Sequence, residues 1–158
     1  MGDVEINLYQ VEEIELVYKQ KVNPNQRPQI RSAQDAYDIF LKAWDENKID
    51  FVEQSKVMFL NRANRVLGIC TISTGGVSGT VVDPKIVFAA SLKANASAII
   101  LAHNHPSGNT QPSDADKRIT DRFIEGGKLL GIEVLDHVIV TREGFHSLAN
   151  EMSYPSPF

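Results

Sequence analysis

Residues 98–116 decide the fold of this chain and read AIILAHNHPSGNTQPSDAD. The apolar run at 98–102 is typical of a central strand that is covered on both faces. This strand delivers a histidine, and the turn Pro106-Ser107-Gly108 then leads the chain away from the sheet. Ser113 predicts the start of a helix. We therefore expect the polar residues of this stretch to gather between a strand end and a helix start.

Two histidines and an aspartate in this stretch have the chemistry of a metal site. His103 and His105 are two residues apart, so their side chains share one face of an extended segment. Asp116 can add a third ligand from the start of the following helix. Three protein ligands with an open fourth position are the arrangement of a catalytic zinc. The pattern therefore predicts one zinc ion, held by His103, His105 and Asp116, that activates a water molecule.

Simpler interpretations of these residues stay open on the pattern alone. A chain with 4 histidines can contain a His-x-His pair by chance, and Ser113 with Asp116 can be a helix capping box. Asp116 would, however, share a helix face with Ile119 and Phe123. A carboxylate on the core-facing side of a helix requires a partner. A zinc ion would be such a partner, so the combination favours the metal site.

The composition is that of one domain, or of one domain with a short arm. The 158 residues carry a net charge of -4 with scattered basic residues, which argues against strong nucleic-acid binding because that binding depends on phosphate neutralisation. One cysteine excludes an intrachain disulfide, and we interpret Cys70, in the apolar run 66–70, as a small buried hydrophobe. With no signal peptide or membrane-spanning run, we expect a cytoplasmic protein.

The chain divides into three predicted parts. Residues 1–28, with alternating strand-like patterns, form an arm or hairpin that pairs with the main sheet or mediates a homo-oligomer. Residues 29–150 form the domain, and residues 151–158 form a tail. Within the domain we expect a helix from the cap Ser32 to about Asn47, strands at 57–60 and 66–69 around a turn at 61–64, a helix from the cap Asp83 to about Ala94, a helix from Ser113 to the Gly126-Gly127 pair or to Gly131, and a strand at 134–140.

The other candidate groups receive more ordinary assignments. His137 lies in a buried strand and is interpreted as a core or second-shell histidine, not as a ligand. His146 follows a turn and is expected at the surface. Asp114 is an exposed carboxylate in the first helical turn, where it favours the helix dipole. The glycine-rich loop at 73–79 lacks the Gly-Lys-Ser/Thr of a P-loop, which argues against phosphate binding.

The spacing of these residues matches a longer pattern: a Glu, then His-x-His-Pro, six residues, Ser, two residues and Asp. Here the pattern stands as Glu53, then residues 103–106, Ser113 and Asp116. On this pattern the chain resembles the RadC-like branch of the JAMM (MPN) metalloprotease family over about residues 50–150. The stretches 95–108 and 134–137 are similar to the same branch. Asn104 points there too, since deubiquitinase members usually carry Ser or Thr at this position.

The resemblance implies an α/β domain with a curved mixed β-sheet flanked by helices, in a layout similar to that of cytidine deaminases. It implies zinc as the cofactor, with His103, His105 and Asp116 as ligands. It implies Glu53 as the general base and then acid, with Glu46 as the weaker candidate, and Ser113 as a hydroxyl donor to the tetrahedral oxyanion. The expected activity is zinc-dependent hydrolysis of amide or isopeptide bonds in a peptide or protein substrate.

A different function competes with this one. Proteins called RadC often carry a helix-hairpin-helix segment that binds DNA, and residues 1–50 show no such pattern. We therefore expect weak DNA binding or none. The rival is a DNA-repair-associated accessory protein with a structural or vestigial metal site, which a basic surface stripe would favour. A zinc deaminase is disfavoured, because such enzymes use a Pro-Cys-x-x-Cys ligand pair and Cys70 is the only cysteine.

Overall fold

The computed structural model describes residues 21–75 and 82–150, together with residues 12, 14, 15, 17 and 19. Residues 1–11 of the predicted arm, most of the glycine-rich loop and the tail at 151–158 lie outside the described residues. The described residues of the arm belong to no strand, and Ile14 and Val17 are exposed. Among the described residues, no helix combines the length and the apolar character that a bilayer span requires.

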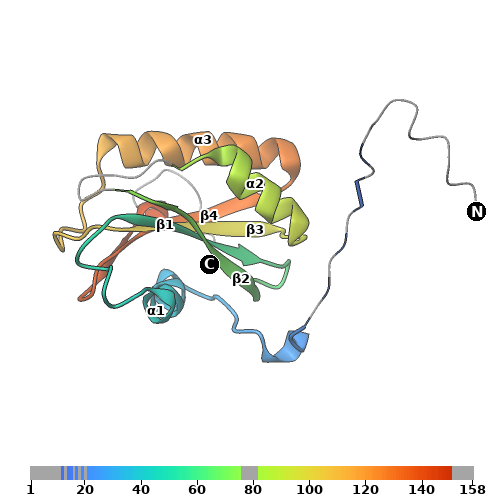
Figure 1. The fold of residues 1–158 in the computed structure, drawn as a ribbon, viewed down its shortest axis with the longest axis horizontal. Coiled ribbons are helices and arrows are strands. Elements are labelled where there is room, and N and C mark those ends of the chain that lie inside the picture. The colour runs from blue at the N-terminus through green and yellow to red at the C-terminus, as the bar shows by residue number, and fades with distance from the viewer. Residues whose placement is uncertain are drawn as a thin grey trace, which may run out of the picture.

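The described residues form an α/β domain in three layers. A mixed sheet has α1 on one face and α2 with α3 on the other (Figure 1). This confirms the predicted fold class. The order of the strands is β2-β1-β3-β4-β5, and all neighbours are antiparallel except β3 and β4, which are parallel. The elements are α1 (Ala33–Ala43), β1 (Gln54–Leu60), β2 (Val66–Thr74), α2 (Pro84–Lys93), β3 (Ala98–Asn104), α3 (Asp114–Leu130), β4 (Glu133–Val140) and β5 (Phe145–Ser147).

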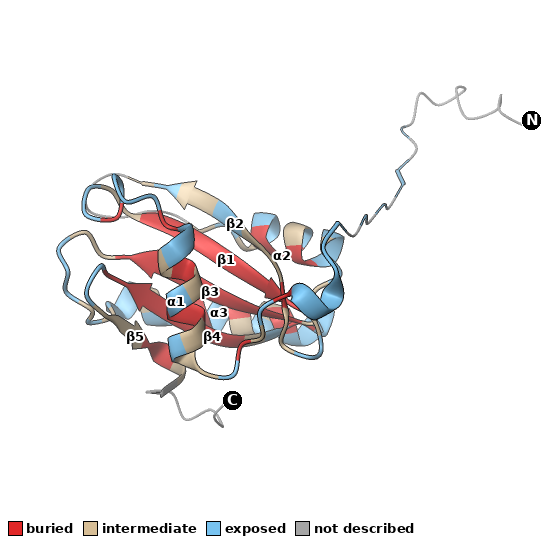
Figure 2. Ribbon diagram, turned by 90° about the horizontal axis from the view of Figure 1, so that it is seen from below, coloured by how far each residue is buried: buried red, intermediate tan, exposed pale blue. Residues whose placement is uncertain are grey.

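Alternating side chains of the central strands fill two cores. On the α1 face Met58, Leu60 and Ile100 join Phe40 of α1 and Trp44, the residue that follows this helix. On the opposite face the intervening residues of the same strands pack against α2 and α3. Every residue of β1 and β3 is buried, as Figure 2 shows for the middle of the sheet. The predicted central strand at 98–102 is confirmed, and burial on both sides explains its continuous apolar run.

Local capping chemistry starts and stops the helices. Asp83 caps α2 with Pro84 as its first residue, as predicted. α3 ends at Gly131, whose left-handed φ of 68° favours glycine, so the later of its two predicted ends is correct. The prediction for α1 was too long, because the helix ends at Ala43. The backbone turns extended at Trp44, and this places its ring in the core beside Phe40.

Two predictions of side-chain burial are wrong, and the positions of the strands explain both. Cys70 is exposed, because β2 is an edge strand in which every residue after Val66 is only partly buried or exposed. His146 is partly buried instead of lying at the surface, because it belongs to β5 and pairs with Ile139 of β4. The predicted hairpin of β1 and β2 around residues 61–64 is confirmed.

Candidate metal centre

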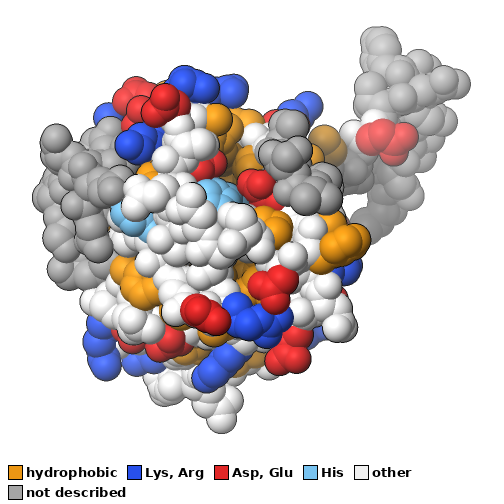
Figure 3. Space-filling view, turned by 90° about the vertical axis from the view of Figure 1, so that its left-hand side faces the viewer, with side chains coloured by type: hydrophobic (Ala, Val, Ile, Leu, Met, Phe, Trp, Pro, Cys, Tyr) orange, Lys and Arg blue, Asp and Glu red, His pale blue; other side chains and the backbone are white. Residues whose placement is uncertain are grey.

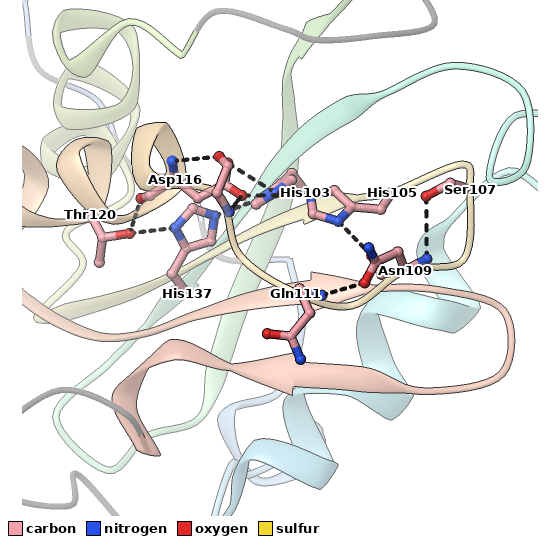
Figure 4. A network of polar contacts seen from close by, with 9 residues as sticks. His103, His105, Ser107, Asn109, Gln111, Asp116, Thr120 and His137 are labelled. Atoms are coloured by element: carbon pink, nitrogen blue, oxygen red, sulfur yellow. Dashed lines mark hydrogen bonds and ion pairs between the residues drawn. The ribbon is translucent and has the colours of Figure 1, made fainter.

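The end of β3 and the first turn of α3 bring three acceptor side chains together. His103 is the penultimate residue of β3, and His105 follows the strand. Asp116 is in the first turn of α3. The two Nε2 atoms of the histidines are 2.9 Å apart. Asp116 places Oδ1 3.3 Å from Nε2 of His103 and Oδ2 3.6 Å from Nε2 of His105. Figure 4 shows the three side chains pointing toward one another.

A capping box aims the aspartate. The Ser113 amide donates to Oδ2 of Asp116 at 2.8 Å, and the Asp116 amide donates to Oγ of Ser113 at 3.0 Å. The capping interpretation of this pair is therefore correct, and it is compatible with the convergence on the histidines. Asp116 caps its own helix while its carboxylate faces His103 and His105, so the helix start sets the direction of the carboxylate.

A chain of hydrogen bonds behind His103 determines which ring nitrogen carries its proton. The Asp116 carbonyl only accepts, so the Thr120 hydroxyl donates to it at 2.7 Å. The Thr120 oxygen then accepts from Nδ1 of His137 at 2.6 Å, which leaves Nε2 of His137 as an acceptor. This Nε2 accepts from Nδ1 of His103 at 2.7 Å. His103 therefore presents the lone pair of Nε2 toward Asp116 and His105.

The second histidine is oriented by a tight loop. Nδ1 of His105 lies 2.6 Å from the Asn109 carbonyl and must donate to it. The loop reaches this position through a turn in which the Gly108 amide donates to the His105 carbonyl at 3.0 Å. Gly108 has a φ of 82°, a conformation that favours glycine. His105 in its neutral form therefore also directs an Nε2 lone pair at the centre.

With both imidazoles neutral in these tautomers, the described side chains present two lone pairs and a carboxylate to one point. Three acceptors this close repel one another, and a cation or a proton between them relieves the repulsion. Burial raises the pKa of Asp116, but hydrogen bonds from the His103 and His105 rings, which form when Nε2 carries a proton, outweigh it and hold that pKa well below its usual range. The hydrogen bond to Asp116 raises the pKa of His105 against the opposing effect of burial. A proton on His105 can therefore supply the positive charge when no metal is bound.

His137 lies behind His103. Its side chain is buried in the core, and among the described residues its Nε2 contacts Nδ1 of His103. Burial and the neighbouring His103 lower the pKa of His137 well below its usual value, so this ring stays neutral. The hydrogen bonds from His103 through His137 to Thr120 require this neutral form, because Nε2 of His137 must remain an acceptor.

Glu53 borders the same centre from the start of β1. It immediately precedes Gln54 and is partly buried. Its carboxylate and the ring nitrogens of His103 and His105 offer ligand atoms that all lie within 4.8 Å of one another. The register explains this proximity, because Ser55 of β1 pairs with His103 of β3. The rival carboxylate Glu46 is exposed in the preceding loop, where its carbonyl accepts from Arg142.

The side chains of His105 and Asp116 are partly exposed, at 18% and 16%. Figure 3 shows histidine side chains at the surface on the side where β3 ends and α3 begins. Ser113, the N-cap of α3, is exposed there, and Asp114 is exposed as predicted. Sequence reasoning missed two residues, Thr120 and the structural role of Asn104. The polar Asn104 between two histidines in a buried strand was the only local signal for the second.

Comparisons with known proteins identify the family of this chain. The family model of the RadC-like JAB domain matches residues 30–153. Relatives called UPF0758 protein are 42% identical over 63% of this chain in Flavobacterium johnsoniae, 48% over 61% in Alkaliphilus metalliredigens and 41% over 80% in Desulfitobacterium hafniense. The chain covers 43%, 41% and 54% of those relatives, or about half of their length. On the family match and the motif geometry together, the chain belongs to the RadC-like JAB domain family.

Proposed function

We propose that this protein is a zinc-dependent hydrolase of amide or isopeptide bonds in peptides or proteins. The observation that carries the proposal is the convergence of His103, His105 and Asp116 on one point with Glu53 beside them. Two neutral imidazoles and one carboxylate are a ligand set that zinc accepts. They leave a fourth position for a reactant, as catalytic zinc sites do.

The spacing of the three ligand atoms is compatible with zinc. Ligand atoms at 2.0–2.1 Å from a tetrahedral ion are separated from one another by roughly 3.3 Å. The distances of 2.9, 3.3 and 3.6 Å between the donor atoms of the three residues bracket that value. The capping box and the tautomer chain direct these donors before any ion binds, so little of the site has to reorganise.

The chemistry divides between the ion and the side chains. When bound, zinc supplies a Lewis acid that lowers the pKa of water toward about 7 and polarises a carbonyl. Glu53 accepts the proton of the attacking water on its carboxylate and then delivers it to the leaving amine. The ligand atoms of Glu53, His103 and His105 lie within 4.8 Å of one another, so this carboxylate would be close to a water activated there.

Ser113 is the proposed donor to the oxyanion. Its Oγ accepts from the Asp116 amide, which leaves the hydroxyl proton available for a second partner. Its exposure lets the hydroxyl turn toward a substrate. A donor of this kind contributes on the order of 2.7–4 kcal/mol to a transition state.

Glu53→Gln tests the catalytic role with the fold held constant. The amide matches the carboxylate in shape but cannot take a proton at neutral pH, so zinc content and thermal stability should persist while turnover of a peptide and isopeptide library falls by roughly 10²–10⁴-fold. Glu46→Gln is the matched control and should keep full turnover. Unchanged hydrolysis in Glu53→Gln would exclude Glu53 as the base.

His105→Ala tests the metal site itself. Loss of this ligand should sharply lower the zinc content that elemental analysis finds in the purified protein. Wild-type stoichiometry in this variant would remove His105 from the ligand set.

A further inference from the structure

Asn104 separates the two histidines of the motif and is the most completely enclosed polar residue near the centre. It is 0% exposed, and side-chain alternation along β3 turns it away from the face that His103 and His105 share. The candidate metal centre described above therefore does not use its side chain. A buried amide has to be satisfied elsewhere, and its partners show where.

The amide group of Asn104 is satisfied entirely by the segment that leads to Glu53. Its Oδ1 accepts from the Gln54 backbone amide at 2.7 Å. Its Nδ2 donates to the carbonyl of Ile49 at 2.8 Å and to the carbonyl of Val52 at 2.9 Å. Glu53 lies between two of these three anchor points, so Asn104 holds the backbone on either side of it.

Two further contacts hold the segment 49–54. On the other side of Glu53, the Gly75 amide donates to its carbonyl at 2.9 Å. At the outer end of the segment, Arg142 binds the Asp50 carboxylate at 2.9 Å, and this pair is solvent-exposed. Exposed ion pairs contribute little, whereas three hydrogen bonds to one fully buried side chain define a geometry.

The hydrogen-bonding partners at position 104 require an asparagine. One acceptor and two donors are needed within one short side chain, and a carboxamide supplies both. A serine or threonine hydroxyl has one proton and is shorter. An aspartate would face two carbonyl oxygens with a carboxylate that has no proton to donate.

We propose that Asn104 is a positioning residue that couples the ligand strand β3 to the segment carrying Glu53. The same strand that presents His103 and His105 thereby sets the distance of the Glu53 carboxylate from both of them. This inference rests on the proposed hydrolase function, and it assigns to the residue between the ligands the placement of the general base.

Asn104→Ser and Asn104→Asp test the coupling. Serine removes the bonds and opens a small cavity, while aspartate keeps the volume and the acceptor for Gln54 but loses the donors to Ile49 and Val52. Arg142→Ala is the matched control, because it frees the outer end of the same segment and leaves Asn104 intact.

The first readout needs no activity. Hydrogen exchange measured by NMR on the metal-free protein should show the Gln54 amide exchanging roughly tenfold faster in Asn104→Ser, which is the effect expected for one lost buried hydrogen bond. Amides in the middle of β1 should keep their protection. Asn104→Asp buries an unpaired carboxylate against two carbonyls, so the Gln54 amide should exchange faster in this variant too. Arg142→Ala should leave Gln54 unchanged.

The second readout asks whether Asn104 acts through Glu53. Zinc content should stay at the wild-type level while kcat falls by roughly 10²-fold with little change in KM, because a displacement of about 1 Å is enough for such a loss. In a Glu53→Gln background, Asn104→Ser should change the residual rate by less than about twofold.

The outcomes separate this inference from the proposed function. Unchanged exchange at Gln54, loss of zinc in Asn104→Ser, or an equal loss of rate in the Glu53→Gln background would each overturn the positioning role. A wild-type protein that binds zinc but hydrolyses no probe would refute the proposed function, and the exchange of Gln54 would still decide the anchoring.

Discussion

Replacing Thr120 by valine breaks the hydrogen-bonded chain behind His103 at its root. Valine matches threonine in shape and removes only the hydroxyl, which accepts from Nδ1 of His137 at 2.6 Å. The His137 ring is buried, so its Nδ1 proton would be left without a partner. The ring then gains by moving the proton to Nε2, where it would donate to His103.

That change reverses the direction of the chain. Nδ1 of His103 would become an acceptor, and the proton of His103 would move to Nε2, the atom that faces Asp116. Zinc binding must then either remove this proton or leave the His137 donor unsatisfied. An unsatisfied buried donor costs about 1–3 kcal/mol, which corresponds to roughly 5- to 150-fold in zinc affinity. Losses of about 10–100-fold are usual when partners of this kind are removed.

The assay is competition for zinc against a chromophoric chelator at neutral pH, with the thermal stability of the metal-free protein measured alongside. Thr141→Val is the matched control, because Thr141 is also buried and its hydroxyl donates to the Gly144 carbonyl at 2.8 Å, outside the His103 chain. Its zinc affinity should match that of the wild type. Equal affinities of Thr120→Val and wild type would refute the tautomer argument, and so would an equal loss in the control.

Three further predictions concern charge, packing and DNA. Burial lowers the pKa of Lys56 against the raising effects of Asp45 and Cys70. The folded protein therefore holds this proton less tightly than the unfolded chain does. The free energy of unfolding of the wild type should consequently increase as the pH rises toward 10.5. Urea unfolding between neutral pH and pH 10 should show this gain relative to Lys56→Met, and parallel pH profiles would contradict it. A Cβ on Gly127 would collide with the Ile132 carbonyl, whereas a Cβ on Gly144 would meet open space. Gly127→Ala should therefore lower the free energy of unfolding in urea by about 1–3 kcal/mol, and Gly144→Ala should lower it far less. Duplex, single-stranded and branched DNA should bind weakly or not at all, at or above a Kd of roughly 10⁻⁴–10⁻⁶ M at physiological salt, and tight structure-selective binding in fluorescence anisotropy would favour the accessory function.

The amino-acid sequence determined the features that depend on neighbours along the chain. The caps at Asp83 and Ser113 and the left-handed end at Gly131 follow from backbone chemistry within one helical turn. The apolar run of β3 identified the central strand, because only a strand covered on both faces has no polar positions. The motif spacing placed His103, His105 and Asp116 at a strand end and a helix start, where the structure brings them together.

Only the tertiary structure decided the features that depend on the order and register of the strands. Cys70 is exposed because its strand lies at the edge, and α1 ends early because Trp44 turns into the core. His103 meets His137 across 34 residues, since β3 and β4 are parallel neighbours, and Asn104 meets Gln54 across 50 residues, since β1 lies on the other side of β3. A hydrogen bond needs its atoms within about 3 Å, and no local preference of the chain carries information about distances between segments so far apart.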